Sequence, residues 1–174
     1  MENDLNDKQI QILEVAETLF AEKGFDGTSI RDISKVAKIN VAMVSYYFGS
    51  KEKLLESLVL FKTSGLKEQL INLIEENLEP IEKINKLIEL YINRINCNRG
   101  IYRILHFELA SKKRVLELPS FSDIKKSNLK SLELIIKEGQ AKGVFRKDII
   151  IELLTPTIMG TFFHFQMNKP FFED

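Results

Sequence analysis

The sequence contains one cysteine, two histidines, no tryptophan and no long uninterrupted hydrophobic run. A single cysteine, Cys97, cannot form an internal disulfide, so nothing here calls for an oxidising compartment. The most apolar stretch, residues 149–165, is interrupted by Glu152, Pro156 and His164, and it falls short of the roughly 18 apolar residues of a membrane-spanning helix. We interpret it as a buried helix. Because the acidic start of the chain also lacks the features of a signal peptide, we expect a cytoplasmic protein with no membrane partner.

Residues that hold metals or carry out catalysis are equally scarce. His106 and Glu108 form an H-x-E pair, but the zinc deaminases that use such a pair also need a later P-C-x-x-C, which this sequence lacks. It has no glycine-rich phosphate loop, nucleophile elbow or paired catalytic carboxylates. We therefore expect no metal, no cofactor and no enzymatic activity. Cys97 is interpreted as a small buried residue rather than a redox sensor, since there is no resolving cysteine.

The whole chain has a net charge of zero, but its segments carry charge of opposite signs. The 25 basic residues balance 25 acidic ones, which excludes a uniformly basic nucleic-acid binder. However, residues 1–27 carry a charge of −5, residues 28–53 carry +3, and the remaining residues carry +2. A local cationic patch is attracted to duplex phosphates through counterion release, whatever the rest of the protein carries. The basic segment is therefore the candidate for a nucleic-acid contact.

Prolines and glycines are few, and between them the apolar residues recur at spacings of three and four, which predicts an all-α protein. We expect eight helices without an internal repeat, at about residues 7–23, 30–37, 41–48, 51–78, 80–95, 101–110, 122–141 and 149–167. The residues expected to cap helix starts are Asn6 or Asp7, Ser29 with Asp32 as a capping box, Asn40, Ser50 and Asp148. Those expected to end helices are Gly24, Gly49 and Gly143. Ile30, Ile33, Val36 and Ala37 are expected to form the buried face of the second helix.

The segment 29–54 carries the most specific pattern. Two short helices joined by the brief turn Ala37-Lys38-Ile39-Asn40 follow the plan of a helix-turn-helix, whose second helix fits a major groove about 12 Å wide. By pattern alone, an ordinary corner in a small helical protein remains the alternative. The local positive charge favours the DNA-binding interpretation.

Residues 10–60 resemble the DNA-binding head of the TetR family of transcriptional regulators. The resemblance rests on three runs: Glu22-Lys23-Gly24-Phe25, Gly27-Thr28-Ser29-Ile30-Arg31-Asp32-Ile33, and Tyr46-Tyr47-Phe48-Gly49-Ser50-Lys51-Glu52-Lys53-Leu54. The rest of the chain resembles the family only in plan. The resemblance implies an all-α fold, with an N-terminal three-helix head carrying the helix-turn-helix (residues 1–50) and a C-terminal helical bundle for ligand binding and dimerisation (residues 51–174). It also implies a homodimeric regulator, most often a repressor, that binds a palindromic operator and is released by a small-molecule effector.

The resemblance also suggests roles for individual residues of the head. Thr28, Ser29 and Lys51 would hold phosphate, and Arg31 would reach a base edge or a phosphate. The recognition helix would present Val41, Ala42, Met43 and Ser45 to the bases and Tyr46 to the backbone, while Tyr47 would pack its ring inward and direct its hydroxyl to phosphate. Val44 and Phe48 would face the core of the head.

This recognition helix contains no Arg, Lys, Asn or Gln, the residues that make bidentate base contacts. We therefore expect readout by apolar contact of Ala42 and Met43 with thymine methyl groups, supplemented by Asn40, Arg31 and DNA shape. Two residues affect the geometry of the turn between the second and third helices. Lys38 stands where the family commonly has glycine, and Ser34 supplies the small residue of the preceding helix.

The aromatic residues of the C-terminal part are either core or the lining of an apolar ligand pocket, for which polar atoms would also be needed. The candidate pocket residues are Tyr91, Tyr102, His106, Phe107 and Phe162. The run Lys112-Lys113-Arg114 is a solvated loop or, alternatively, a patch for a phosphate-bearing ligand such as an acyl-CoA.

The last helix is apolar nearly all round, so something must cover it, and a partner subunit is the simplest cover. The candidate dimer residues are Leu153, Ile158, Gly160 and Phe163. The family usually adds one further helix to this interface, whereas the chain stops at Asp174, so either the sequence is truncated or the interface is built differently. The alternative function is a helical adaptor or lipid-binding protein whose head makes protein contacts.

Overall fold

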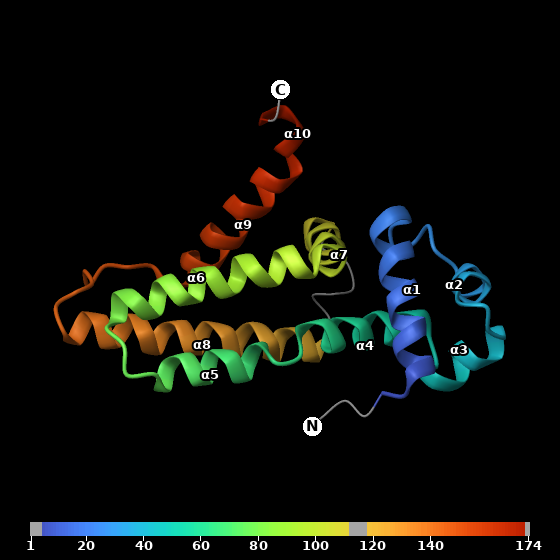
Figure 1. Ribbon diagram of the computed structural model, residues 1–174, viewed down its shortest axis with the longest axis horizontal. Coiled ribbons are helices and arrows are strands. Elements are labelled where there is room, and N and C mark those ends of the chain that lie inside the picture. The colour runs from blue at the N-terminus through green and yellow to red at the C-terminus, as the bar shows by residue number, and fades with distance from the viewer. Residues whose placement is uncertain (1–4, 112–117, 173–174) are drawn as a thin grey trace. The chain divides into compact units, whose positions relative to one another are not determined.

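The computed structural model describes residues 5–111 and 118–172, and in these ranges the chain forms helices and no strands (Figure 1). The elements are α1 (Asp7–Lys23), α2 (Ile30–Ala37), α3 (Val41–Phe48), α4 (Lys51–Thr63), α5 (Leu66–Glu75), α6 (Pro80–Cys97), α7 (Arg99–Ala110), α8 (Pro119–Ala141), the 3-10 helix η2 (Ile151–Leu153), α9 (Leu154–Met167) and α10 (Lys169–Phe172). The predicted all-α fold is confirmed. The helices group into two compact units: the first runs to Ser64 and takes in Asn98–Asp123, and the second consists of Gly65–Cys97 and the chain from Ile124 onward.

The residues predicted to cap the first helices of the chain do so in the structure. The Asn6 side chain accepts a hydrogen bond from the backbone N–H of Gln9, and the Gln9 side chain accepts one from the backbone N–H of Asn6, which completes a capping box. Ser50 caps α4 by accepting from the N–H of Lys53. Gly24 and Gly49 follow the last residues of α1 and α3 with φ of 73° and 76°, a region that glycine enters without steric cost. These local devices explain why the first three helix boundaries were predictable.

The first unit is built around α1, which packs against α2, α4 and α7. Its buried apolar residues are Ile12, Leu13, Ala16, Leu19, Phe20, Phe25, Ile33, Ala37, Val44, Phe48, Leu54, Leu55, Leu58, Val59, Ile101, Ile104, Leu105 and Phe121. The expected burial of Val36 is wrong, because Ile33, Ser34 and Ala37 form the buried side of α2 and leave Val36 exposed. A continuous core therefore fixes the head helices to α4 and α7.

The second unit has a core between α5, α6 and α8. Its buried members are Leu66, Leu70, Leu73, Leu87, Tyr91, Leu132, Ile135 and Ile136. Lys83 is buried at the edge of this core, and its ammonium donates to the carbonyl oxygen of Ile74 at 2.8 Å and to the Glu138 carboxylate at 2.9 Å. Figure 1 shows α9 and α10 extending away from α5, α6 and α8. This core aligns three helices and leaves much of α9 outside it.

The single helix predicted over residues 51–78 is wrong, because the chain breaks it at Ser64 and Gly65. Gly65 adopts a left-handed conformation with φ of 75°. The hydroxyls of Thr63 and Ser64 donate to the carbonyls of Val59 and Phe61, which is the local competition by which such side chains end helices. The α4–α5 break adds a helix that the apolar periodicity did not predict.

Other boundaries differ less. The sixth and seventh expected helices start earlier, at Arg99 and Pro119. The last predicted helix starts at Leu154, after η2, so Asp148 does not cap it, and α10 follows as a separate short helix. Cys97, expected to be buried, is exposed at the end of α6.

The interpretation of residues 149–165 as a buried helix is also wrong for this chain. None of the residues of α9 is fully buried, and Phe165 and Met167 are exposed. The reason is that α9 packs on α6 along one side only, with no second layer over its other side in the residues described. Within the described ranges, no helix is both long enough and apolar enough to cross a membrane.

Candidate nucleic-acid interface

The helix-turn-helix begins at Ser29, which caps α2. Its hydroxyl oxygen accepts a hydrogen bond from the Asp32 N–H at 3.1 Å and the hydroxyl donates to the Asp32 carboxylate at 2.5 Å. The same carboxylate accepts from the Ser29 N–H at 2.9 Å, and these bonds from Ser29 lower the pKa of Asp32. Ser29 is exposed, as a phosphate contact requires, but Asp32 already occupies part of the helix N-terminus.

Thr28 lies elsewhere than the resemblance suggested. It is 1% exposed, and its hydroxyl donates to the carbonyl oxygens of Leu19 at 3.2 Å and Gly24 at 2.9 Å. A hydroxyl directed at two carbonyls inside the head fixes the end of α1 to the loop before α2. It does not present itself to a phosphate, so of this pair only Ser29 remains at the surface.

The turn between α2 and α3 is made by Lys38, the one non-glycine residue with positive φ among those described, at φ 53° and ψ 45°. Its N–H bonds back to the carbonyls of α2, while Gln11 of α1 donates from its side-chain amide to the Ala37 carbonyl at 3.1 Å. Ser34 is buried beneath this turn, where a small residue leaves room for α3. The tight turn therefore forms without glycine, at the cost of a left-handed lysine.

The recognition helix α3 has one inward and one outward side. Val44 and Phe48 are buried, which confirms their predicted core role. The outward residues are Val41, Ala42, Ser45 and Tyr46, with Met43 and Tyr47 partly buried beside them. Tyr46 is 84% exposed, and its ring meets that of Tyr47 edge-on at 5.3 Å between centroids. Asn40 caps the helix by accepting from the Ala42 N–H at 2.8 Å.

Positive charge lies beside this surface rather than on it. Arg31 and Lys35 are exposed on α2, and Lys38 is exposed in the turn, whereas α3 has no charged residue. A surface of methyl, hydroxyl and phenol groups with cationic residues along one flank can pack against base edges and attract the neighbouring phosphates. Helices α2 and α3 pack against each other (Figure 1). The exposed first residues of α2 and the exposed residues of α3 thus form one candidate interface.

Lys51 is engaged within the head. Its ammonium donates to the carbonyl oxygens of Phe25 at 2.9 Å and Thr28 at 2.8 Å, and it lies 4.2 Å from the centroid of the Phe25 ring. Sequence reasoning missed this contact and that of Gln11 with Ala37. These hydrogen bonds span 23 or 26 residues and end on backbone carbonyls, so no local side-chain pattern could have indicated them.

The predicted ligand residues fall in both units. Tyr102, His106 and Phe107 lie on α7, with His106 and Phe107 exposed, whereas Tyr91 is buried in the core of the second unit and Phe162 lies on α9. In the second unit an apolar depression of about 450 Å³ includes Phe162 and none of the other four. It is lined by Ile88, Ile92, Thr157, Ile158, Thr161, Phe162 and Phe165. The basic run 112–114 lies outside the described residues.

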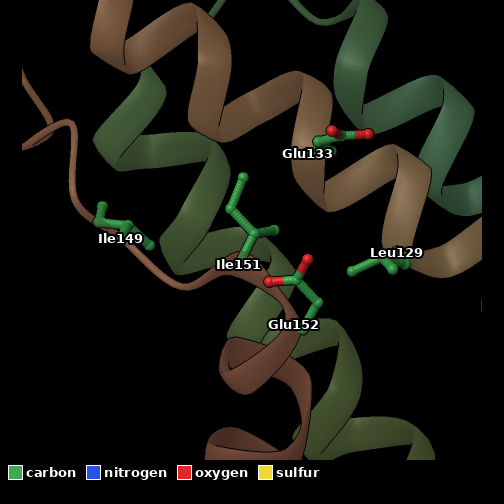
Figure 2. Close-up of a pocket in the computed structure, with 5 residues that line it drawn as sticks. All are labelled: Leu129, Glu133, Ile149, Ile151 and Glu152. Carbon is green, nitrogen blue, oxygen red and sulfur yellow. The ribbon is translucent and has the colours of Figure 1, made fainter.

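Figure 2 shows a second, smaller depression of about 220 Å³ where the chain around η2 faces α8. It is lined by Leu129, Glu133, Ile149, Ile151 and Glu152, and contains no predicted ligand residue. Glu133 is already paired with Lys137 at 2.9 Å. Throughout residues 5–111 and 118–172, no three His, Cys, Asp or Glu side chains are grouped so that they could hold a metal ion.

The predicted dimer residues lie at or near the exposed side of α9. Leu153 is exposed, Ile158 and Phe163 are partly buried, and Gly160 is exposed with nothing within 4 Å of the position that a Cβ would occupy.

Comparison with known proteins finds one family model that matches the head and another that matches the C-terminal part of the chain. Residues 12–58 match the model of the bacterial regulatory proteins of the tetR family, and residues 80–174 match the tetracyclin repressor-like C-terminal domain. The HTH-type transcriptional repressor NicS of Pseudomonas putida is 29% identical over 167 residues, which cover 91% of this chain and 75% of NicS.

Two solved structures have the same fold. The ketosteroid transcriptional regulator KstR2 of Mycobacterium tuberculosis superposes with a TM-score of 0.76 at 25% identity, covering 93% of this chain and 83% of KstR2. HlyIIR, a hemolysin II transcriptional regulator, has a TM-score of 0.73 at 32% identity, covering 93% of this chain and 91% of HlyIIR. All three relatives are regulators rather than enzymes. Since the head and more than half of the chain beyond it match the two family models, this chain belongs to the tetR family of bacterial regulatory proteins and is a DNA-binding transcriptional regulator.

Proposed function

We propose that the protein represses transcription as a homodimer, with DNA binding in residues 1–50 and with effector binding and dimerisation in residues 51–174. Two copies of α3 would enter successive major grooves of a palindromic operator, about 34–36 Å apart or somewhat more. The observation that carries the proposal is the division of α3 into a core side and a solvent side. Val44 and Phe48 are buried, while Val41, Ala42, Ser45 and Tyr46 are exposed on the same helix.

The proposed reading of DNA is largely apolar. Ala42 and Met43 contact thymine methyl groups, Ser45 contacts a base edge, and Tyr46 and Tyr47 direct their hydroxyls at the backbone. This reading is supported by the exposure of Ala42, Ser45 and Tyr46 on α3, by the partly accessible Met43 and Tyr47 beside them, and by the absence of longer polar side chains on this helix. Val41, Asn40, Ser29 and Arg31 complete the proposed contact set, with Arg31 on a base or a phosphate. Of the residues suggested by the family resemblance, Thr28 and Lys51 already bond to carbonyls inside the head.

Selection of bound duplexes from a random library tests this reading. The expected result is a palindrome with thymines at the positions facing α3. Met43→Ala should change the preference at particular base positions, whereas Lys35→Ala, a matched change on the exposed side of α2, should weaken all duplexes alike. Uniform weakening by Met43→Ala would contradict a base-reading role. Failure to enrich any duplex at low salt would contradict the proposed function.

The proposed dimer uses α9, through Leu153, Ile158, Gly160 and Phe163. The support is that α9 is predominantly apolar yet has no buried residue in the single chain, and that an apolar depression opens beside it on α6. Apolar surface of this kind is stable in water when a partner covers it.

Gly160→Arg tests the dimer. Because nothing lies within 4 Å of the added Cβ, the single chain should tolerate the substitution. Sedimentation is expected to show dimers for the wild type and monomers for Gly160→Arg. Asn72→Arg, which adds the same side chain at an exposed position of α5, should leave the dimer intact. An unchanged profile for Gly160→Arg would move the interface elsewhere.

We further propose that a small, largely apolar effector releases the operator, with Tyr91, Tyr102, His106, Phe107 and Phe162 as candidate contacts. A ligand can shift DNA affinity only by its differential affinity for the two states of the protein. A suitable panel contains a ketosteroid, because KstR2 is a ketosteroid regulator, and a long-chain acyl-CoA. The expected result is loss of operator binding with at least one member, and His106→Ala or Phe162→Ala should raise the concentration required. Exposed Asn72→Ala is the control.

A further inference from the structure

Lys38 follows α2 in a backbone conformation that few residues adopt. Its φ of 53° and ψ of 45° are left-handed, and among the residues described it alone has a positive φ without being glycine. The Cβ atom of an L-residue crowds the following carbonyl oxygen in this region, so glycine or asparagine is the less strained choice. Strained backbone positions gather at functional sites. The conformation of Lys38 therefore suggests that its side chain has a role outside the turn.

The turn itself does not use the Lys38 side chain. The backbone N–H of Lys38 donates to the carbonyl of Lys35 at 3.3 Å, and the side-chain amide of Gln11 donates to the carbonyl of Ala37 at 3.1 Å. The acceptors are backbone atoms that any residue at position 38 would leave in place. A glycine could make the same turn with less strain.

The Lys38 ammonium has no partner in the structure. It makes no hydrogen bond or ion pair with any of residues 5–111 and 118–172, and the residue is exposed. Residues 33–51 contain no aspartate or glutamate, so no carboxylate in this stretch competes for the charge. By contrast, the ammonium of Lys62 is paired with the Glu17 carboxylate. The Lys38 ammonium is therefore available to an external anion.

The position of Lys38 indicates which anion this is. Lys38 stands two residues before Asn40, which caps the recognition helix α3, and exposed Arg31 and Lys35 lie on the helix before it. In helix-turn-helix proteins the N-terminal residues of the recognition helix contact base edges, and the phosphates of both strands border the groove. A lysine beside the start of α3 can therefore reach a phosphate at the edge of that groove.

We propose that Lys38 binds a backbone phosphate at the edge of the groove that α3 enters, and that this contact, not the fold of the turn, explains a lysine in a left-handed conformation. The inference rests on the proposed function, because it adds a residue to the same interface. It is specific to this chain, since the glycine common in the family at this position offers no side chain. Stability of the head and affinity for DNA thus oppose each other at Lys38.

The test uses two neutral replacements that accept a positive φ, Lys38→Gly and Lys38→Asn, and one that keeps the charge, Lys38→Arg. Binding is measured to two fluorescent duplexes of about 30 base pairs, the selected operator and a mixed sequence, over a series from about 50 to 200 mM salt. Lys67→Ala, which removes an exposed lysine from α5, controls for the loss of one charge.

Both neutral variants should make the slope of log K against log salt shallower by about 0.9 for each bound head, on both duplexes. Their loss of affinity should therefore be about 3.5 times larger at 50 mM than at 200 mM salt for each bound head. Lys38→Arg and Lys67→Ala should keep the wild-type slope. Lys38→Gly should also unfold at a higher urea concentration than the wild type, so its weaker binding could not come from an unfolded head.

Three results would overturn the inference. A wild-type slope in both neutral variants, whatever their affinity, would show that Lys38 neutralises no phosphate. A slope as shallow for Lys38→Arg as for the neutral variants would trace the effect to the turn conformation, and a loss confined to the operator would indicate contact with a base. If the wild type bound neither duplex at the lowest salt, the proposed function itself would fail, and that result is distinguishable from the other three.

Discussion

Replacing Glu17 by alanine removes one carboxylate that serves two other helices. One oxygen of Glu17 accepts a hydrogen bond from the backbone N–H of Ile101 at 2.9 Å, in the first turn of α7. The other lies 2.8 Å from the ammonium of Lys62 on α4. Asn98, at the cap position of α7, makes no side-chain cap hydrogen bond, so Glu17 supplies that function from α1.

The magnitude follows from these contacts. Loss of a helix cap costs about 1 kcal/mol, and loss of a negative charge at a helix N-terminus about 0.5 kcal/mol. The ion pair, whose side chains are 15% and 20% exposed, adds roughly 0.5 kcal/mol after allowance for solvent screening. Glu17→Ala should therefore destabilise the protein by about 2 kcal/mol, which lowers the melting temperature by roughly 4–8 °C for a chain of this size.

Urea unfolding followed by circular dichroism, together with calorimetry, measures this effect. Glu14→Ala is the matched control: it removes an exposed glutamate from the preceding turn of α1 and should change stability by less than about 0.5 kcal/mol. Lys62→Met removes the ion pair and leaves the cap, so its cost should be about a quarter of that for Glu17→Ala. If Glu17→Ala were as stable as Glu14→Ala, the reasoning that joins α7 to the head through this carboxylate would be refuted.

Substitutions at three further positions test how backbone conformation, close packing and charge affect stability. Lys38→Gly should stabilise the head by about 0.5–1 kcal/mol in urea unfolding, because it relieves a left-handed lysine; Lys38→Ala should bring no such gain. Gly139→Ala should cost about 1–3 kcal/mol in urea unfolding, because the new Cβ would lie 2.0 Å from the ring of Phe145. Hydrogen bonds from Lys83 and Lys142 hold the pKa of Glu138 below its ordinary 4.5, so its stabilisation is present above about pH 4.5 and lost as the pH falls through the lower folded-state pKa. The melting temperatures of wild type and Glu138→Gln should therefore differ near neutral pH and converge in acid, and a constant difference would contradict this.

The boundaries of the head were predictable because they depend on neighbouring residues. Asn6, Ser29 and Asn40 each bond to an N–H two or three residues ahead, and Gly24 and Gly49 end helices through their own backbone freedom. Such short-range interactions leave a pattern that can be recognised in the sequence.

The break at Ser64 and Gly65 was not predictable in the same way. Apolar residues continue at helical spacing across it, and the isolated glycine did not outweigh that periodicity. The exposure of α9 also escaped the prediction, because burial depends on which helices surround a segment and not on its own composition.

The sequence by itself determined the all-α class, the helix-turn-helix with its inward Val44 and Phe48, and the resemblance that leads to the tetR family. These properties follow from residue spacing and local hydrogen bonds. Only the tertiary structure decided that Thr28 and Lys51 hold the loop before α2, and that Glu17 caps α7. Each of these polar groups acts on a backbone atom distant in the sequence, and a side chain's chemical type does not reveal which distant carbonyl or N–H the fold will bring to it.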